Sequence, residues 1–240
     1  MKYLNITAPI AIIIAIIIAS SASATETQKH LFILSGQSNM EGLDPSISFT
    51  PVVSAALGED KVTIVKDAAS GQPIRRWYKE WKPLHGDTKA NNGDLYDRLM
   101  NKVNKAIGQD EFDTITFIWM QGEKDARQGH GEVYAASLKG LIEQLSEDLG
   151  RKEINFVIGR LSDFDMENKG YPHWTMVRKA QVEVAESSPQ GTWVNTDDLN
   201  EGFNKKGQAI QNDLHYSVDG YKEFGKRLAE ASLQLIQQAQ

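Results

Sequence analysis

A serine in a short Gly-Gln-Ser-Asn segment is the first residue whose setting suggests chemistry. Ser38 follows an apolar run, residues 30–34, and Gly36 permits a sharp turn between the two. A helix is expected to follow, and its free N–H groups would then favour a developing oxyanion beside an exposed hydroxyl. Ser38 is therefore a candidate nucleophile. The alternative is a serine that only caps the helix.

A histidine near the C-terminus is the candidate base. His215 lies directly before the last amphipathic stretch of the chain, in the segment 212–217. Histidine titrates near neutral pH and is the natural base for a serine nucleophile. Standing alone, such a residue would be interpreted as an ordinary surface histidine, so the hypothesis depends on its pairing with Ser38.

Two further loops carry polar groups or an open backbone. Gly71 has no Cβ, so its N–H can approach a ligand closely, although an ordinary turn is an equal alternative. Gln121 offers an amide suited to an oxyanion, and Glu123 and Asp125 could orient loops or bind sugar hydroxyls. The alternative for this second loop is a solvated turn.

Short apolar runs alternate with amphipathic stretches and must position these groups. The runs are nearly continuous, as in strands buried on both faces of a parallel sheet, and the alternation predicts a three-layer α/β domain. The carboxyl ends of such strands gather reactive groups, and the candidates in the first three loops follow strands. The predicted strands are 30–34, 62–65, 114–119, 154–158 and 192–194, and the predicted helices are 94–107, 133–149, 174–187 and 218–238.

Composition excludes several classes of function. The 240 residues carry a formal net charge of −6 without clustered cations, which argues against nucleic acid as a partner. The chain has no cysteine, so disulfides and thiolate metal sites are excluded. Its five histidines lack the close spacing of zinc ligands. No metal and no cofactor is therefore expected.

The N-terminal segment is interpreted as a secretory signal peptide, residues 1–24. Lys2 precedes an apolar run at 8–19, and Ala22-Ser23-Ala24 fits the small-residue cleavage rule. A membrane anchor is the alternative, but the run is short against the roughly 20 residues needed to span. The prediction is one exported domain, residues 25–240, periplasmic or extracellular and without a membrane partner after cleavage.

Four motifs, whose order and spacing extend over about residues 31–228, carry a family resemblance. They are Gly36-Gln37-Ser38-Asn39-Met40, Gly71 before Trp77, Trp119-Met120-Gln121-Gly122-Glu123-Lys124-Asp125, and Leu214-His215-Tyr216-Ser217. Together they resemble the SGNH-hydrolase superfamily, most closely its sialate O-acetylesterase and plant-type carbohydrate acetylesterase branch.

The resemblance implies a flavodoxin-like fold with a mainly parallel sheet of about five strands, and no metal. It implies Ser38 as nucleophile, His215 as base, and an oxyanion hole made by the Ser38 and Gly71 N–H groups and the Gln121 side chain. The expected activity is that of a secreted serine esterase that removes acetyl groups from a saccharide or polysaccharide. Sugar contacts are expected from Glu123, Trp77 and Trp174, although core packing is the safer default for any one aromatic residue.

The chain departs from this pattern beside the base. The resemblance predicts an aspartate three residues before His215, where the chain has Asn212, and Asp213 stands one place later. Three arrangements stay open: Asp213 supports the imidazole, Asn212 orients it, or serine and histidine act as a dyad. Asp213 is favoured because a full charge stabilises an imidazolium more than an amide does. The departure also supports a rival reading, a non-catalytic carbohydrate-binding or surface protein that retains the hydrolase fold.

Overall fold

A single parallel sheet forms the centre of the molecule. The computed structural model describes Met1 and residues 28–87 and 91–238, so the interpretation of residues 1–24 as a signal peptide falls outside the described residues apart from Met1. Five strands lie in the order β2-β1-β3-β4-β5, with all four pairings parallel. They are β1 His30–Gly36, β2 Val62–Ala68, β3 Thr114–Met120, β4 Asn155–Gly159 and β5 Gly191–Val194. The predicted parallel α/β sheet of about five strands is confirmed.

Two strands run further than their apolar residues predicted. β1 and β2 continue side by side through Leu34↔Lys66, Ser35↔Asp67 and Gly36↔Ala68. Asp67 is buried there and pairs with Arg98 and Lys102. Backbone pairing and these ion pairs extend the ladder into polar residues, which hydropathy alone cannot predict.

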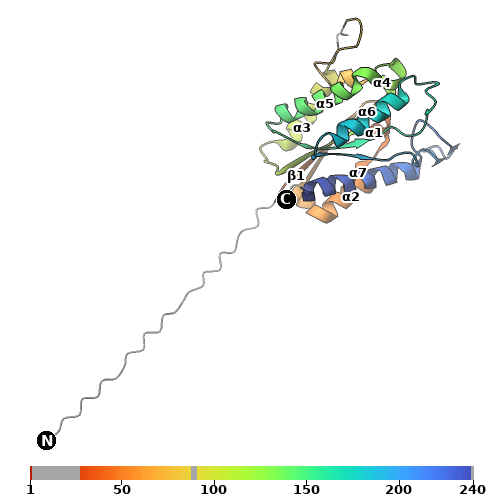
Figure 1. Cartoon of the computed structure of the whole chain (residues 1–240). Coiled ribbons are helices and arrows are strands. Elements are labelled where there is room, and N and C mark those ends of the chain that lie inside the picture. The colour runs from red at the N-terminus through yellow and green to blue at the C-terminus, as the bar shows by residue number, and fades with distance from the viewer. Residues whose placement is uncertain (2–27, 88–90, 239–240) are drawn as a thin grey trace.

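Helices cover both faces of the sheet (Figure 1). α2 and α7 lie together on one face, and α3, α5 and α6 lie on the other. The helices are α1 Ser38–Gly42, α2 Pro45–Leu57, α3 Asp94–Ile107, α4 Glu123–Gln128, α5 Gly131–Asp148, α6 Trp174–Glu186 and α7 Val218–Gln238. Each of the four helices whose ranges were predicted is present, and α3 and α7 have the predicted bounds. Within residues 28–87 and 91–238, no helix is long and apolar enough to cross a membrane.

One long helix, α2, was not predicted from the sequence. Its apolar residues do not form a single face, and Pro51 lies inside it. The start nevertheless carries a recognisable signal, because Asp44 Oδ1 accepts from Ser46 N at 3.0 Å and Pro45 occupies the first turn.

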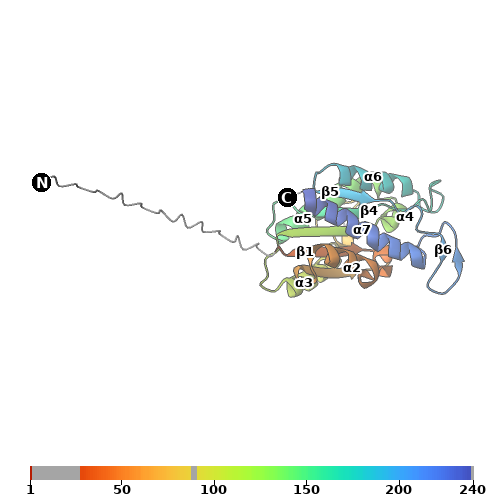
Figure 2. The ribbon, with the colours of Figure 1, turned by 90° about the horizontal axis from the view of Figure 1, so that it is seen from below.

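A small hairpin projects beyond the carboxyl edge of the sheet (Figure 2). β6 Gly202–Phe203 and β7 Ala209–Ile210 pair antiparallel, and Phe203 is exposed at 64%. Strands of two residues carry no periodicity, so the sequence did not predict them. Because this hairpin stands where the strands end, its residues are within reach of the loops that hold the candidate site.

Candidate active site

A tight turn brings Ser38 to the carboxyl edge of the central strand. Gly36 ends β1 with φ +144°, and a Cβ there would lie 1.9 Å from the Met120 carbonyl oxygen of β3. Only glycine tolerates both conditions. Gln37 N then donates to Met120 O at 2.9 Å, and Ser38 begins α1. The β1–α1 connection is thereby fixed against the neighbouring strand, with the serine hydroxyl on its partly exposed side.

The two residues expected to react lie in contact. Ser38 Oγ is 3.0 Å from His215 Nε2, across a separation of 177 residues. The imidazole stands on the loop before α7 and is 49% exposed. This distance suits transfer of the hydroxyl proton to the imidazole.

The carboxylate beside the imidazole is Asp213. Its Oδ1 lies 3.9 Å from His215 Nδ1, beyond hydrogen-bonding distance, and accepts instead from His215 N at 2.8 Å. Asn212, with φ 47°, offers its Oδ1 to Asn200 Nδ2 at 3.4 Å. Of the two alternatives, Asp213 is the one whose side chain lies near the ring. Its carboxylate can act on the imidazole by charge but makes no hydrogen bond to it.

The two aspartates after β5 are engaged elsewhere. Asp197 pairs with Arg160 and Arg178, and Asp198 pairs with Arg227. These ion pairs leave neither carboxylate directed at His215.

The Gly71 turn lies next to the serine loop. Gly36 and Ala68 are paired in the sheet, and Ala69 N donates to Gly36 O at 3.0 Å. Gly71 has φ +68°, and a Cβ there would meet nothing within 4 Å, so the turn borders open space. Within the part of the chain that the structure describes, neither the Ser38 nor the Gly71 N–H donates a hydrogen bond. Both groups are available to a ligand, as an oxyanion hole requires.

Gln121 occupies a different position from the one expected of an oxyanion donor. The side chain is fully buried, and its Nε2 donates to Asp125 Oδ2 at 2.6 Å and to Gln72 O at 3.0 Å. A third acceptor, Gln37 Oε1, lies at 3.2 Å. An amide has only two hydrogens, so this arrangement leaves none for an oxyanion. The geometry supports Gln121 as a link between loops.

The three residues expected to contact sugar are buried, which argues against direct contact between them and a sugar. Trp77 is 0% exposed and packs edge-on against Trp119, with ring centroids 5.2 Å apart. Trp174 is 1% exposed and donates from Nε1 to Ser162 O at 2.7 Å. Glu123 is 1% exposed, and burial raises the pKa of its carboxyl to about 7. Motif position alone did not distinguish core residues from groove residues.

The groove beside the reacting pair has a volume of about 550 Å³ and is lined mainly by residues that carry a polar group. The hairpin supplies part of its wall, which nothing in the sequence had indicated. Tyr216 contributes from the loop before α7 and Tyr221 from the first turn of α7, and Ile210 is the one aliphatic side chain in the lining. The lining residues are Ser38, Glu41, Gly42, Ser70, Asn204, Lys205, Lys206, Gln208, Ile210, Asp213, His215, Tyr216 and Tyr221.

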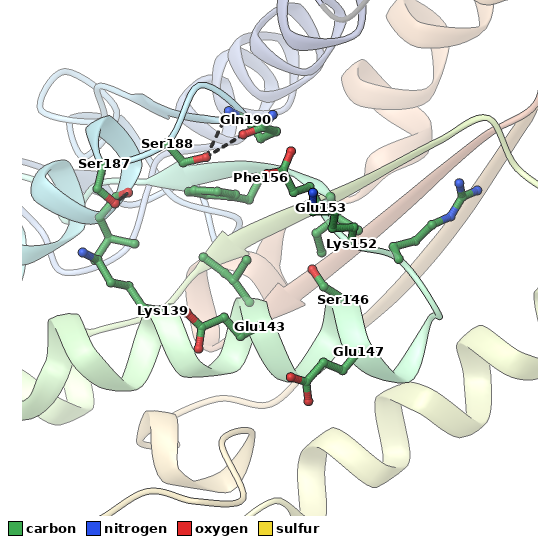
Figure 3. Close-up of a pocket in the computed structure, with 14 residues that line it drawn as sticks. Lys139, Glu143, Ser146, Glu147, Lys152, Glu153, Phe156, Ser187, Ser188 and Gln190 are labelled. Atoms are coloured by element: carbon green, nitrogen blue, oxygen red, sulfur yellow. Dashed lines mark hydrogen bonds between the residues drawn. The ribbon is translucent and has the colours of Figure 1, made fainter.

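A second hollow lies at the opposite edge of the sheet (Figure 3). Charged residues of α5 such as Lys139 and Glu143 border it, and Phe156 at the start of β4 lies at its floor. Ser188, on the connection to β5, donates to Gln190 Oε1 at 2.8 Å and faces no histidine among the lining residues. In α/β sheets ligands bind outside the carboxyl ends of the strands, so the Ser38 groove is the better candidate site.

The fold and this site together define the class of protein. A five-stranded parallel sheet between helices, with serine and histidine in contact at its carboxyl edge, is the architecture of an SGNH-type hydrolase. Residues 41–234 match the model of the family described as "Carbohydrate esterase, sialic acid-specific acetylesterase". The chain belongs to this family and is a carboxylic ester hydrolase by that membership. The match begins at Glu41 and therefore does not include Ser38.

Solved structures show the same fold at low sequence identity. A protein from Arabidopsis thaliana is 19% identical, with a TM-score of 0.64 over 86% of this chain and 98% of that one. NanS is 12% identical, with a TM-score of 0.60 over 88% and 98%. A carbohydrate acetylesterase from Xanthomonas citri is 16% identical, with a TM-score of 0.58 over 85% of this chain and 56% of that one. No curated protein matches the chain by sequence.

Proposed function

We propose that this protein removes acetyl groups from saccharides through an acyl-enzyme on Ser38, with His215 as the base. The observation that carries the proposal is the 3.0 Å contact between Ser38 Oγ and His215 Nε2 in an open groove. Family membership supplies the expected bond, an ester on a carbohydrate.

The geometry supports the following steps. His215 Nε2 takes the Ser38 hydroxyl proton while Oγ bonds to the acetyl carbonyl carbon, and the carbonyl oxygen becomes an oxyanion facing the Ser38 and Gly71 N–H groups. The imidazolium then gives its proton to the leaving sugar oxygen as the ester bond breaks. Water, deprotonated by His215, attacks the acetyl-serine and releases acetate, which restores both residues.

Asp213 supports the imidazolium by charge alone in this proposal. At 3.9 Å and 43% exposed, its carboxylate acts through a partly aqueous path, so its contribution is smaller than that of a buried hydrogen-bonded aspartate. The site therefore works as a serine–histidine dyad with electrostatic assistance.

The chemistry of the groove favours a small acyl group on a polar alcohol. Most of its lining residues carry a hydroxyl, amide or charged group, and Ile210 is the one aliphatic residue among them. A long acyl chain would need an extended apolar surface in order to gain binding free energy from its burial. Acetyl needs none, and sugar hydroxyls find donors and acceptors on the hairpin.

Covalent labelling separates this proposal from the non-catalytic, carbohydrate-binding alternative. A phosphonofluoridate probe should modify Ser38 in the wild type and fail to label His215→Ala at a comparable rate, because the hydroxyl reacts only when activated. A wild-type protein that stays unlabelled would favour the binding protein. Acetate release from acetylated xylan, pectin, sialic acid and peptidoglycan would then identify the substrate.

The proposal also includes export of a single domain, residues 25–240. Only the sequence of the N-terminal segment supports this part. The small-residue site Ala22-Ser23-Ala24 predicts Thr25 as the mature N-terminus. Mass spectrometry of exported protein that still carried residues 1–24 would instead support the anchor.

A further inference from the structure

The side chain next to the nucleophile is buried and makes four polar contacts. Asn39 is 1% exposed, and its Nδ2 donates to Leu214 O and to Glu123 Oε1, both at 3.1 Å. Its Oδ1 accepts from Tyr216 N at 3.4 Å and from Tyr221 OH at 3.1 Å. Every hydrogen-bonding direction of this amide is therefore in use.

Two of these contacts hold the backbone on either side of the base. Leu214 and Tyr216 flank His215, as Asn39 follows Ser38. The Asn39 amide thus binds both the carbonyl of the residue before His215 and the N–H of the residue after it. Asn39 itself is next to Ser38 in the chain. The imidazole itself is half-exposed. The further bond from His215 N to Asp213 Oδ1, at 2.8 Å, stays within the same loop. The Asn39 bonds, in contrast, connect the loop of the base to the residue beside the nucleophile.

Glu123 fixes the orientation of the amide. Its Oε1 accepts the second Nδ2 hydrogen, so a flipped amide would direct Oδ1 at the carboxyl and at the Leu214 carbonyl. Glu123 Oε2 is buried and makes no hydrogen bond to the described residues. A buried carboxyl with an unpaired oxygen is a cost to folding, which suggests that its position serves the site.

We propose that Asn39 is a positioning residue that sets the Ser38–His215 distance, with Glu123 holding its amide in the required orientation. The inference rests on the proposed function, in which that pair reacts. Neither side chain touches substrate, so the expected effect lies on the chemical step.

The first test is Asn39→Ala. Loss of both backbone links should lower kcat by about 10²-fold, the loss typical of a 1 Å misplacement of a catalytic group. KM should stay within about threefold, since substrate binding is not altered. The rate of phosphonofluoridate labelling of Ser38 should fall in parallel. Tyr221→Phe removes one contact to Oδ1 and leaves both backbone links, so its loss of kcat should be several times smaller; because Tyr221 also lines the groove, the comparison uses kcat and not KM.

The second test uses a matched pair at position 123. Glu123→Leu removes the acceptor for Nδ2 and should lower kcat, whereas Glu123→Gln restores an oxygen at that place and should regain most of the loss. If Glu123 had only a structural role, Glu123→Leu and Glu123→Gln proteins of equal Tm would have the same kcat.

Tyr96→Phe is the control for stability. It removes a partly buried 2.8 Å hydrogen bond from the buried Tyr96 to Asp148, between α3 and α5 and away from the groove, and should lower Tm without changing kcat. Should Asn39→Ala fail to fold, Asn39→Asp has the same shape, loses the link to Leu214 O and keeps the acceptor for Tyr216 N, so kcat should still fall, by less than in Asn39→Ala.

Three outcomes overturn the inference: normal kcat in a folded Asn39 variant, a kcat loss in Tyr96→Phe as large as that in Asn39→Ala, or no rescue by Glu123→Gln. Activity retained by Ser38→Ala would instead overturn the proposed function itself.

Discussion

The two halves of the candidate site are built in opposite ways. The Ser38–His215 pair is open to solvent, with an imidazole 49% exposed and a carboxylate 3.9 Å from it. The loop after β3 is closed, with Gln121 and Asp125 fully buried and hydrogen bonded. The motif residues of this site therefore have two roles. Residues expected to react must be accessible to substrate, whereas residues that connect loops are buried and hydrogen bonded.

The largest effect should come from the open half. Ser38→Ala should lower the rate of acetate release from an acetyl ester such as p-nitrophenyl acetate by about 10³-fold or more, because serine and base act as a unit. Circular dichroism and Tm should stay near those of the wild type, since the hydroxyl is at the surface. Near-normal turnover would mean that Ser38 only begins a helix.

Gln121→Ala tests the closed half. Its removal leaves buried groups of Asp125 and Tyr134 with fewer partners, so the free energy of unfolding should fall by about 2–4 kcal/mol. Urea denaturation measures this loss. An unchanged midpoint together with a kcat loss of about 10²–10³-fold would restore Gln121 as an oxyanion donor.

Glu123 gives the closed half a pH dependence. Burial raises the pKa of its carboxyl from 4.5 to about 7, so between these values the folded state holds a proton that the unfolded state lacks. The stability from this group is complete below pH 4.5 and is lost as pH rises through 7. The free energy of unfolding of Glu123→Gln should therefore rise relative to that of the wild type, by up to about 3 kcal/mol, as the pH increases from 4.5 to 8. Equal pH slopes of unfolding free energy for both proteins would contradict the raised pKa.

The smallest effect should distinguish the two neighbours of the base. Asp213→Ala should lower kcat by about tenfold, since its charge acts across 3.9 Å in a partly aqueous setting. Asn212→Ala should stay within about threefold, because its amide oxygen faces Asn200. A loss of several orders of magnitude in Asp213→Ala would mean that the loop closes into a hydrogen-bonded triad when substrate binds. A large loss in Asn212→Ala would instead assign the imidazole partner to the amide.

Local pattern was sufficient for most of the fold. Continuous apolar runs predicted all five strands, since a strand covered on both faces needs apolar residues throughout. α3 and α7 carry one apolar face each, and their ends were predicted to the residue. α2 and the 202–210 hairpin carried no such pattern and were missed.

The candidate residues Ser38 and His215 follow from the sequence, because their types and their places next to predicted elements limited the chemistry. Which polar residues of the motifs reach the groove depends on how distant segments pack. Trp77 and Glu123 belong to the motifs yet lie in the core, while Lys205 lines the groove from a segment that no pattern singled out. The reason is physical: residue type sets what a side chain can do, but exposure and distance arise when segments up to 177 residues apart pack together.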